Sequence, residues 1–119
     1  MFKIPYSKQF IDSEDIKSVV SVLKSKFITT GPKILKFEEK LTKYFDSKFA
    51  IAVNSETSAL HLSCLALGLK KNDFVWTTPV SFVASANCAI YCGAKIDFVD
   101  IDNDTFNIST KSLENKLNA

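Results

Sequence analysis

Apolar residues recur every three or four positions in the first third of the chain, which predicts two amphipathic helices. The first is predicted to begin at Asp12 or Ser13, because both residue types favour a helix N-terminus, and the second follows Gly31-Pro32. The apolar faces consist of Ile16, Val19, Val20 and Leu23 in the first helix and of Ile34, Phe37, Leu41 and Phe45 in the second. Residues 1–47 are therefore predicted to form an N-terminal helical segment with a loop between its two helices.

From residue 48 the pattern changes to short apolar runs that alternate with helical stretches. The runs "KFAIAVN", "DFVWTT" and "KIDFVDI" predict three strands over 48–54, 73–78 and 95–101. Each is followed by a predicted helix, of which the first two are closed by Gly68 and Gly93 and the last is capped by Ser109 or Thr110. This order, βαβαβα over residues 48–119, predicts an α/β chain with a mainly parallel sheet. The helix before Gly68 is apolar nearly all round, so we expect it to be buried on both sides.

Composition and charge exclude several classes of partner. The 119 residues carry a formal charge of +2 that is spread along the chain, so we expect no nucleic-acid partner. No secretory leader is readable, and no apolar run reaches the ~18–20 residues that a membrane span needs. We therefore expect a cytoplasmic protein without a membrane partner. Three cysteines in such a compartment do not predict a disulfide framework.

The stretch "NSETSALH", residues 54–61, places hydroxyl side chains at the joint between the first predicted strand and its helix. Ligands of open parallel sheets bind beyond the carboxyl ends of the strands, and the amide groups that open a helix favour an anion. Ser55, Thr57 and Ser58 could therefore complete a phosphate cradle, although the carboxylate of Glu56 would compete for the same positive end. Ordinary capping by Ser55 explains the same pattern and stays open as the alternative.

The next strand–helix joint, "TTPVSF", places Phe82 in the first turn of its predicted helix, at the same edge of the sheet. A ring there could stack on a flat heteroaromatic ligand whose phosphate lies in the cradle. A core position for Phe82 is the alternative interpretation.

No metal site is predicted. The possible soft ligands are His61, Cys64, Cys88 and Cys92. However, Cys64 lies inside an apolar helix, where a free cysteine behaves as a small hydrophobic residue. The stretch from Asp100 to Thr105 resembles the start of a calcium loop, but Thr105 replaces the required glycine and Lys111 the required glutamate.

Taken together, five stretches resemble the DegT/DnrJ/EryC1/StrS family, the pyridoxal-phosphate-dependent sugar aminotransferases of the aspartate-aminotransferase fold type. They occur in order between residues 27 and 102: "TTGP", "FE", "NS-x-TSAL", "TTP-x-SFVA-x-AN" and "GAKIDFVDID". The resemblance implies the N-terminal part of a fold-type-I large domain, incomplete at residue 119. The chain departs from the family pattern at Glu56, where a small residue, often glycine, is usual, and at Asn72, where glycine is usual.

The resemblance also implies roles for individual residues. The cofactor-binding residues would be Ser55, Thr57 and Ser58 for the phosphate and Phe82 for stacking on the pyridine ring. The residues near the nucleotide sugar, partly across a homodimer interface, would be Tyr6, Thr29, Thr30 and Gly31. The aspartate that pairs with the pyridine nitrogen and the lysine that binds the cofactor aldehyde would lie beyond residue 119, so no catalytic residue is predicted within the chain.

The implied activity is transfer of an amino group from glutamate to a UDP-linked 4-keto-6-deoxy amino sugar, since the stretches are most similar to the pseudaminic acid branch of the family. Because the two chemical groups named above are missing, we expect the chain to be inactive alone. Two alternatives stay open: a non-catalytic remnant or interaction fragment, and a sugar dehydratase of the same family, in which histidine replaces the lysine.

Overall fold

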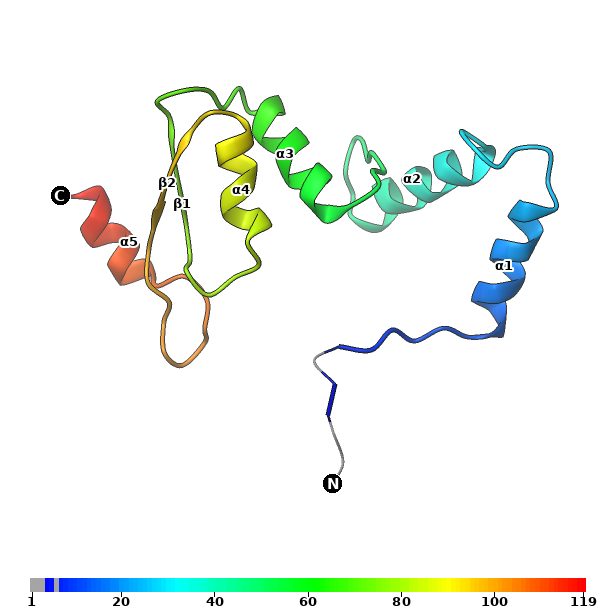
Figure 1. Cartoon of the computed structure of the whole chain (residues 1–119), viewed down its shortest axis with the longest axis horizontal. Coiled ribbons are helices and arrows are strands. Elements are labelled where there is room, and N and C mark those ends of the chain that lie inside the picture. Colours follow the sequence, from blue (N-terminus) through cyan, green and yellow to red (C-terminus); the bar gives the residue numbers. More distant parts are fainter. Residues whose placement is uncertain (1–3, 6) are drawn as a thin grey trace. The chain divides into compact units, whose positions relative to one another are not determined.

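The N-terminal unit contains the two predicted helices. The structure, a computed structural model, describes residues 4–5 and 7–119. It divides into two compact units, with the boundary along the chain between Ala52 and Val53. The predicted division after residue 47 stays a prediction. The first unit contains α1 (Ser13–Leu23) and α2 (Pro32–Tyr44) (Figure 1). The Asp12 carboxylate accepts hydrogen bonds from the amides of Glu14 and Asp15 and so caps α1. Pro32 opens α2 as predicted.

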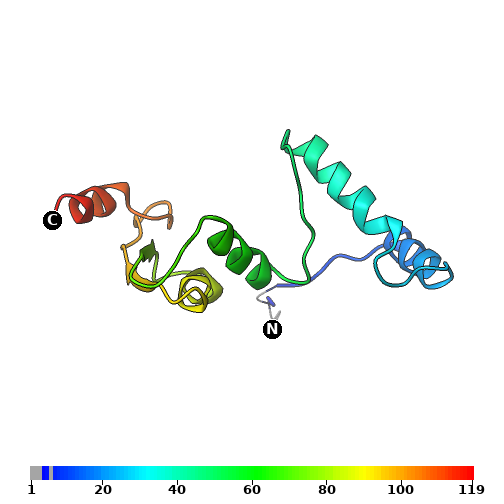
Figure 2. The same cartoon turned by 90° about the horizontal axis from the view of Figure 1, so that it is seen from above.

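The second unit is a small α/β sandwich of α3 (Glu56–Ala66), β1 (Phe74–Thr77), α4 (Ala84–Tyr91), β2 (Lys95–Phe98) and α5 (Thr110–Leu117). Strands β1 and β2 pair in parallel, with Phe74 opposite Lys95 and Thr77 opposite Phe98. Helix α4 packs against both strands and against α3. Helices α3 and α4 lie on one side of the strands and α5 on the other (Figures 1 and 2). The predicted fold class, α/β with a parallel sheet, is confirmed.

The core of the second unit is built around α4. The buried side chains are small ones, which lets the helix approach its neighbours closely: Ala84, Cys88, Ala89, Ala94 and Val99. The helices on either side of β1 end at Gly68 and Gly93, whose φ angles of +77° and +76° favour glycine. Both predicted helix ends are confirmed.

Two predictions about this unit are wrong. Residues 48–54 do not form a strand, and Phe49 and Ile51 are 74% and 80% exposed. A strand requires a hydrogen-bonded neighbour, and within the described residues β1 and β2 pair only with each other. The amide of Ala52 instead donates to the Glu38 carboxylate at 2.8 Å. Helix α3 is not buried on both sides, because among the described helices and strands only α4 packs extensively on it, and Leu62 and Leu65 remain 49% exposed.

Lys116 fastens α5 to the strands. Its ammonium group donates to the carbonyl oxygen of Phe98 at 2.9 Å, pairs with the Asp97 carboxylate at 2.5 Å, and lies 5.3 Å from the centre of the Trp76 ring. The hydrogen bond from Lys116, together with one from the amide of Phe98, lowers the pKa of Asp97 below its usual value. This one side chain therefore contacts both β1 and β2.

Candidate functional site

The first turn of α3 has the form that a phosphate cradle needs. Ser55 is the N-cap with extended backbone (φ −158°, ψ 158°), and its hydroxyl oxygen accepts the amide of Ser58 at 3.1 Å. The amides of Glu56 and Thr57 also belong to this turn, where intrahelical acceptors do not exist. Ser55 and Glu56 are exposed to solvent, so the helix start is open to a ligand. Capping by Ser55 and an anion site are both compatible with this geometry.

The hydroxyl groups of this turn form a network that the sequence did not predict. Ser58 Oγ donates to Asn54 Oδ1 at 2.7 Å and lies 3.0 Å from Ser55 Oγ. Asn54 therefore orients Ser58. The sequence held a signal for this role, because an asparagine four positions before a serine at a helix start can form a hydrogen bond with it. Thr57 is half-buried beside this network. The donor set of two amides and up to three hydroxyls fits a phosphate group by its chemistry.

Phe82 lies at the start of α4, but not within the helix. The prediction placed it in the first turn, whereas α4 begins at Ala84 and Val83 is its N-cap residue. The helix begins later because Val83 offers no capping side chain, while the amide of Ser85 donates to the Phe82 carbonyl at 3.0 Å in a tighter turn. The Phe82 side chain is 67% exposed, so it is not a core residue.

Phe82 lines a pocket of about 240 Å³ where β1 and β2 end and α4 begins. The pocket combines aromatic rings with hydroxyl groups, and its lining residues are Thr77, Thr78, Pro79, Ser81, Phe82, Val83, Ser85, Ala86 and Phe98. This is the carboxyl edge of the parallel strands, where open sheets bind ligands. Phe98 and the serines of this pocket were not among the predicted site residues. Ser81 and Ser85, four positions apart at a helix start, were the available signal.

The second unit therefore holds all four predicted cofactor residues on the packed pair α3 and α4. Ser55, Thr57 and Ser58 are together at the start of α3, and Phe82 is at the start of α4. The pocket around Phe82 does not include the three polar residues. The three polar residues lie in the first turn of α3, and Phe82 lies in the loop before α4.

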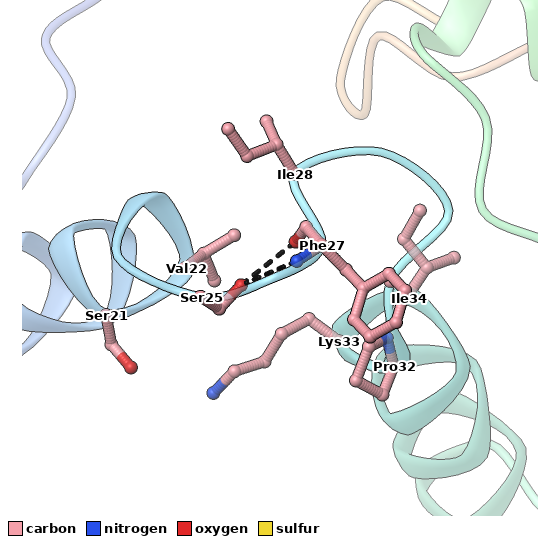
Figure 3. Close-up of a pocket in the computed structure, with 9 residues that line it drawn as sticks. Ser21, Val22, Ser25, Phe27, Ile28, Pro32, Lys33 and Ile34 are labelled. Carbon is pink, nitrogen blue, oxygen red and sulfur yellow. Dashed lines mark hydrogen bonds between the residues drawn. The ribbon is translucent and has the colours of Figure 1, made fainter.

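The predicted substrate residues that the structure describes lie in the first unit. Thr29 and Thr30 are exposed, and Thr30 has a positive φ of 49°, an uncommon conformation for a threonine. Gly31 is the N-cap of α2 and lines a pocket of about 180 Å³ together with Phe27, Ile28 and Lys33 (Figure 3). Tyr6 lies outside the described residues. The loop is accessible, and a lysine and the amides that open α2 supply positive charge beside it.

Three thiols gather where α3 and α4 pack. Cys88 is buried, Cys64 and Cys92 are half-buried, and all three are free. Desolvation, then hydrogen bonding with Cys88 and the charges of Cys88 and Cys92, raise the pKa of Cys64 to about 11. His61 is in edge contact with the Tyr91 ring at 5.4 Å. Within residues 4–5 and 7–119, no group of three or more His, Cys, Asp or Glu side chains could hold a metal ion.

None of the helices that the structure describes combines the length and the apolar character needed to cross a bilayer.

Comparison with known proteins places these features in a family context. The profile of the DegT/DnrJ/EryC1/StrS aminotransferase family matches residues 9–119. The chain is 48% identical over 114 residues to the UDP-4-amino-4,6-dideoxy-N-acetyl-beta-L-altrosamine transaminase of Campylobacter jejuni, covering 96% of this chain and 30% of that protein. The chain thus spans about 30% of the length of the curated relatives that it matches.

Solved structures give the same result. The PLP form of Spr1654 from Streptococcus pneumoniae superposes with a TM-score of 0.87 at 34% identity, over 96% of this chain and 29% of that one. The GDP-4-keto-6-deoxy-D-mannose-3-dehydratase of E coli with bound hydrated PLP gives a TM-score of 0.87 at 33% identity, over 97% and 31%. Both structures match nearly the whole of this chain.

Proposed function

This chain belongs to the DegT/DnrJ/EryC1/StrS aminotransferase family, and we therefore propose that it supplies the phosphate- and ring-binding part of a pyridoxal-phosphate-dependent sugar aminotransferase. The amino acceptor would be a UDP-linked 4-keto-6-deoxy amino sugar of the pseudaminic acid type and the donor glutamate, in the cytoplasm. The observation that carries the proposal is the open first turn of α3, where the hydroxyls of Ser55 and Ser58 lie 3.0 Å apart and Thr57 belongs to the same turn.

In this proposal the amides of Glu56 and Thr57 and the Thr57 hydroxyl would donate hydrogen bonds to the phosphate. Ser58 joins them once its hydroxyl turns away from Asn54, to which it donates at 2.7 Å. The positive end of α3 adds a favourable interaction with the anion. The Glu56 side chain is exposed and stays in solvent.

The Phe82 ring would cover one face of the pyridine ring and exclude water from it. When bound, the cofactor supplies the electron sink that amino transfer requires. The residues of this chain would contribute binding and orientation of the cofactor.

The loop of Thr29, Thr30 and Gly31, with Tyr6, would contact the nucleotide sugar, in part across the interface of a homodimer. Lys33 and the start of α2 lie beside this loop and suit the negative diphosphate. A second candidate activity, sugar dehydration, is favoured by one observation: a solved GDP-4-keto-6-deoxy-D-mannose-3-dehydratase is as similar in fold, with a TM-score of 0.87, as the Spr1654 structure.

Titration with pyridoxamine 5′-phosphate, which does not react with lysines, tests the proposed function. The ³¹P NMR signal of the ligand should broaden or shift on binding to the wild-type chain. Thr57→Val removes one hydroxyl donor to a charged group, worth about 1.5–3 kcal/mol, and should weaken binding roughly 10- to 100-fold. Thr57→Ser keeps the hydroxyl and should bind like the wild type. If Thr57→Val and Thr57→Ser bind the ligand equally, the Thr57 hydroxyl does not contact the phosphate.

A further inference from the structure

Ser85 makes two hydrogen bonds to the segment that carries Phe82. Its amide donates to the Phe82 carbonyl oxygen at 3.0 Å, and its hydroxyl lies 3.0 Å from Ser81 Oγ, within hydrogen-bond distance. Ser81 lies in the loop before Phe82, and Ser85 lies after it in the first turn of α4. Ser85 thus binds the loop on both sides of the Phe82 side chain.

Packing alone does not fix the Phe82 ring in the described structure. The side chain is 67% exposed, and its neighbours Val80 and Val83 are 62% and 59% exposed. The other side-chain hydrogen bond in this loop, from Thr78 Oγ1 to the Val80 carbonyl, is long at 3.3 Å. The orientation of Phe82 therefore depends on the backbone that carries it, and Ser85 makes both a main-chain and a side-chain hydrogen bond to that backbone.

We propose that Ser85 is a positioning residue for cofactor binding: through Ser81 and the Phe82 carbonyl it holds the Phe82 ring over the place of the pyridine ring. This inference rests on the proposed function. Loss of the Ser85 hydroxyl removes the contact with Ser81 and keeps the main-chain hydrogen bond to the Phe82 carbonyl. It should loosen the loop that carries the ring and leave the phosphate donors on α3 unchanged.

The lining of the adjacent pocket supports this role. Ser81, Phe82 and Ser85 all border the 240 Å³ pocket at the carboxyl edge of β1 and β2. The paired hydroxyls of Ser81 and Ser85 hold the pocket wall in one conformation and add no charge to it. A mobile loop at this point would present the ring at variable angles and lower the affinity for a stacked ligand.

The test compares Ser85→Ala with Ser85→Thr, which keeps the hydroxyl, and with Ser63→Ala, an exposed serine of α3. Without ligand, hydrogen exchange at the amides of residues 85 and 86 should accelerate about fivefold in Ser85→Ala, as expected for one lost neutral hydrogen bond. Ser85→Thr and Ser63→Ala should exchange like the wild type. Unchanged exchange in Ser85→Ala would overturn the proposal, whether or not the chain binds cofactor.

With pyridoxamine 5′-phosphate present, a ring stacked on Phe82 shifts the ligand's ring-proton signals upfield, whereas phosphate contact alone moves only the ³¹P signal. Ser85→Ala should lose most of the proton shift and keep the ³¹P change, and Ser85→Thr should restore the proton shift. A full proton shift in Ser85→Ala would overturn the positioning role. No ³¹P change in the wild type would instead count against the proposed function, while the exchange experiment would still decide the role of Ser85.

Discussion

Three substitutions of Ser55 separate its capping role from the proposed anion site. Ser55 caps α3 through one hydrogen bond from the Ser58 amide, at 3.1 Å. Ser55→Ala removes this bond and should lower the free energy of unfolding by about 1 kcal/mol. Ser55→Asn and Ser55→Asp both restore a capping oxygen and should keep near wild-type stability. Urea unfolding followed by circular dichroism measures these differences.

Asparagine and aspartate have almost the same shape and differ in charge, so their comparison isolates the electrostatic term. A carboxylate at the N-cap would lie beside a phosphate bound to the amides of Glu56 and Thr57. At a separation of about 4–6 Å, and with the screening expected at an exposed position, repulsion of about 1–3 kcal/mol follows. Ser55→Asp should therefore bind pyridoxamine 5′-phosphate roughly 5- to 150-fold more weakly than Ser55→Asn.

The affinity is read from ³¹P NMR titrations at low ionic strength and repeated in 0.5 M salt. The difference between the two variants should shrink in salt, because screening weakens repulsion between exposed charges. Ser55→Ala, which lacks one of the proposed hydroxyl donors, should bind more weakly than the wild type at temperatures where it is folded. If Ser55→Asp and Ser55→Asn bind the ligand equally, no anion lies at the start of α3 and the reasoning is refuted.

Three further predictions concern stability. Val99→Ala removes two methyl groups at a site that is 2% exposed and should cost about 2–3 kcal/mol in urea unfolding, whereas Val80→Ala, at a 62% exposed site, should cost less than about 0.5 kcal/mol; equal costs would contradict the core assignment. The hydrogen bond from Lys116 lowers the pKa of Asp97, so the ionised carboxylate stabilises the fold above the ordinary aspartate pKa of ~3.9, and this stability is lost as the pH falls through the lowered pKa. Unfolding midpoints from pH 2 to 7 should show this loss, and the same acid dependence in Asp97→Asn would refute it. Gly68→Ala, at φ +77° with open space around the added methyl, should cost about 1 kcal/mol and Gly68→Asn less, as measured by thermal unfolding.

Local signals predicted most of the elements. Asp12, Pro32 and the two glycines at positions 68 and 93 act on the residues next to them, so their effects could be read from the sequence. The fold class followed from the alternation of strands and helices. The strand over 48–54 failed because its formation depends on neighbours that no local pattern can supply.

The site residues stay a prediction, but their place in the fold could be predicted in part from the sequence. The hydroxyls were expected at the start of α3 because helix starts and sheet edges follow general rules. The partners that orient them were missed: Asn54 holds Ser58, and Ser85 holds the loop of Phe82. Such contacts depend on rotamers and loop geometry, which a single sequence does not determine. The start of α4 was predicted too early, because the N-cap residue Val83 has no capping side chain that would mark the helix start in the sequence.

The most direct test of the account is a ¹⁵N and ¹³C NMR titration of the chain with pyridoxamine 5′-phosphate. The account predicts that the largest amide shifts occur at Glu56, Thr57 and Ser58, and that nuclear Overhauser contacts connect the ligand's 2-methyl group to the Phe82 ring. Inorganic phosphate should reproduce the amide shifts without affecting Phe82. Shifts confined to other residues, or ligand contacts that leave both the α3 start and Phe82 unaffected, would contradict the assignment of this site to the cofactor.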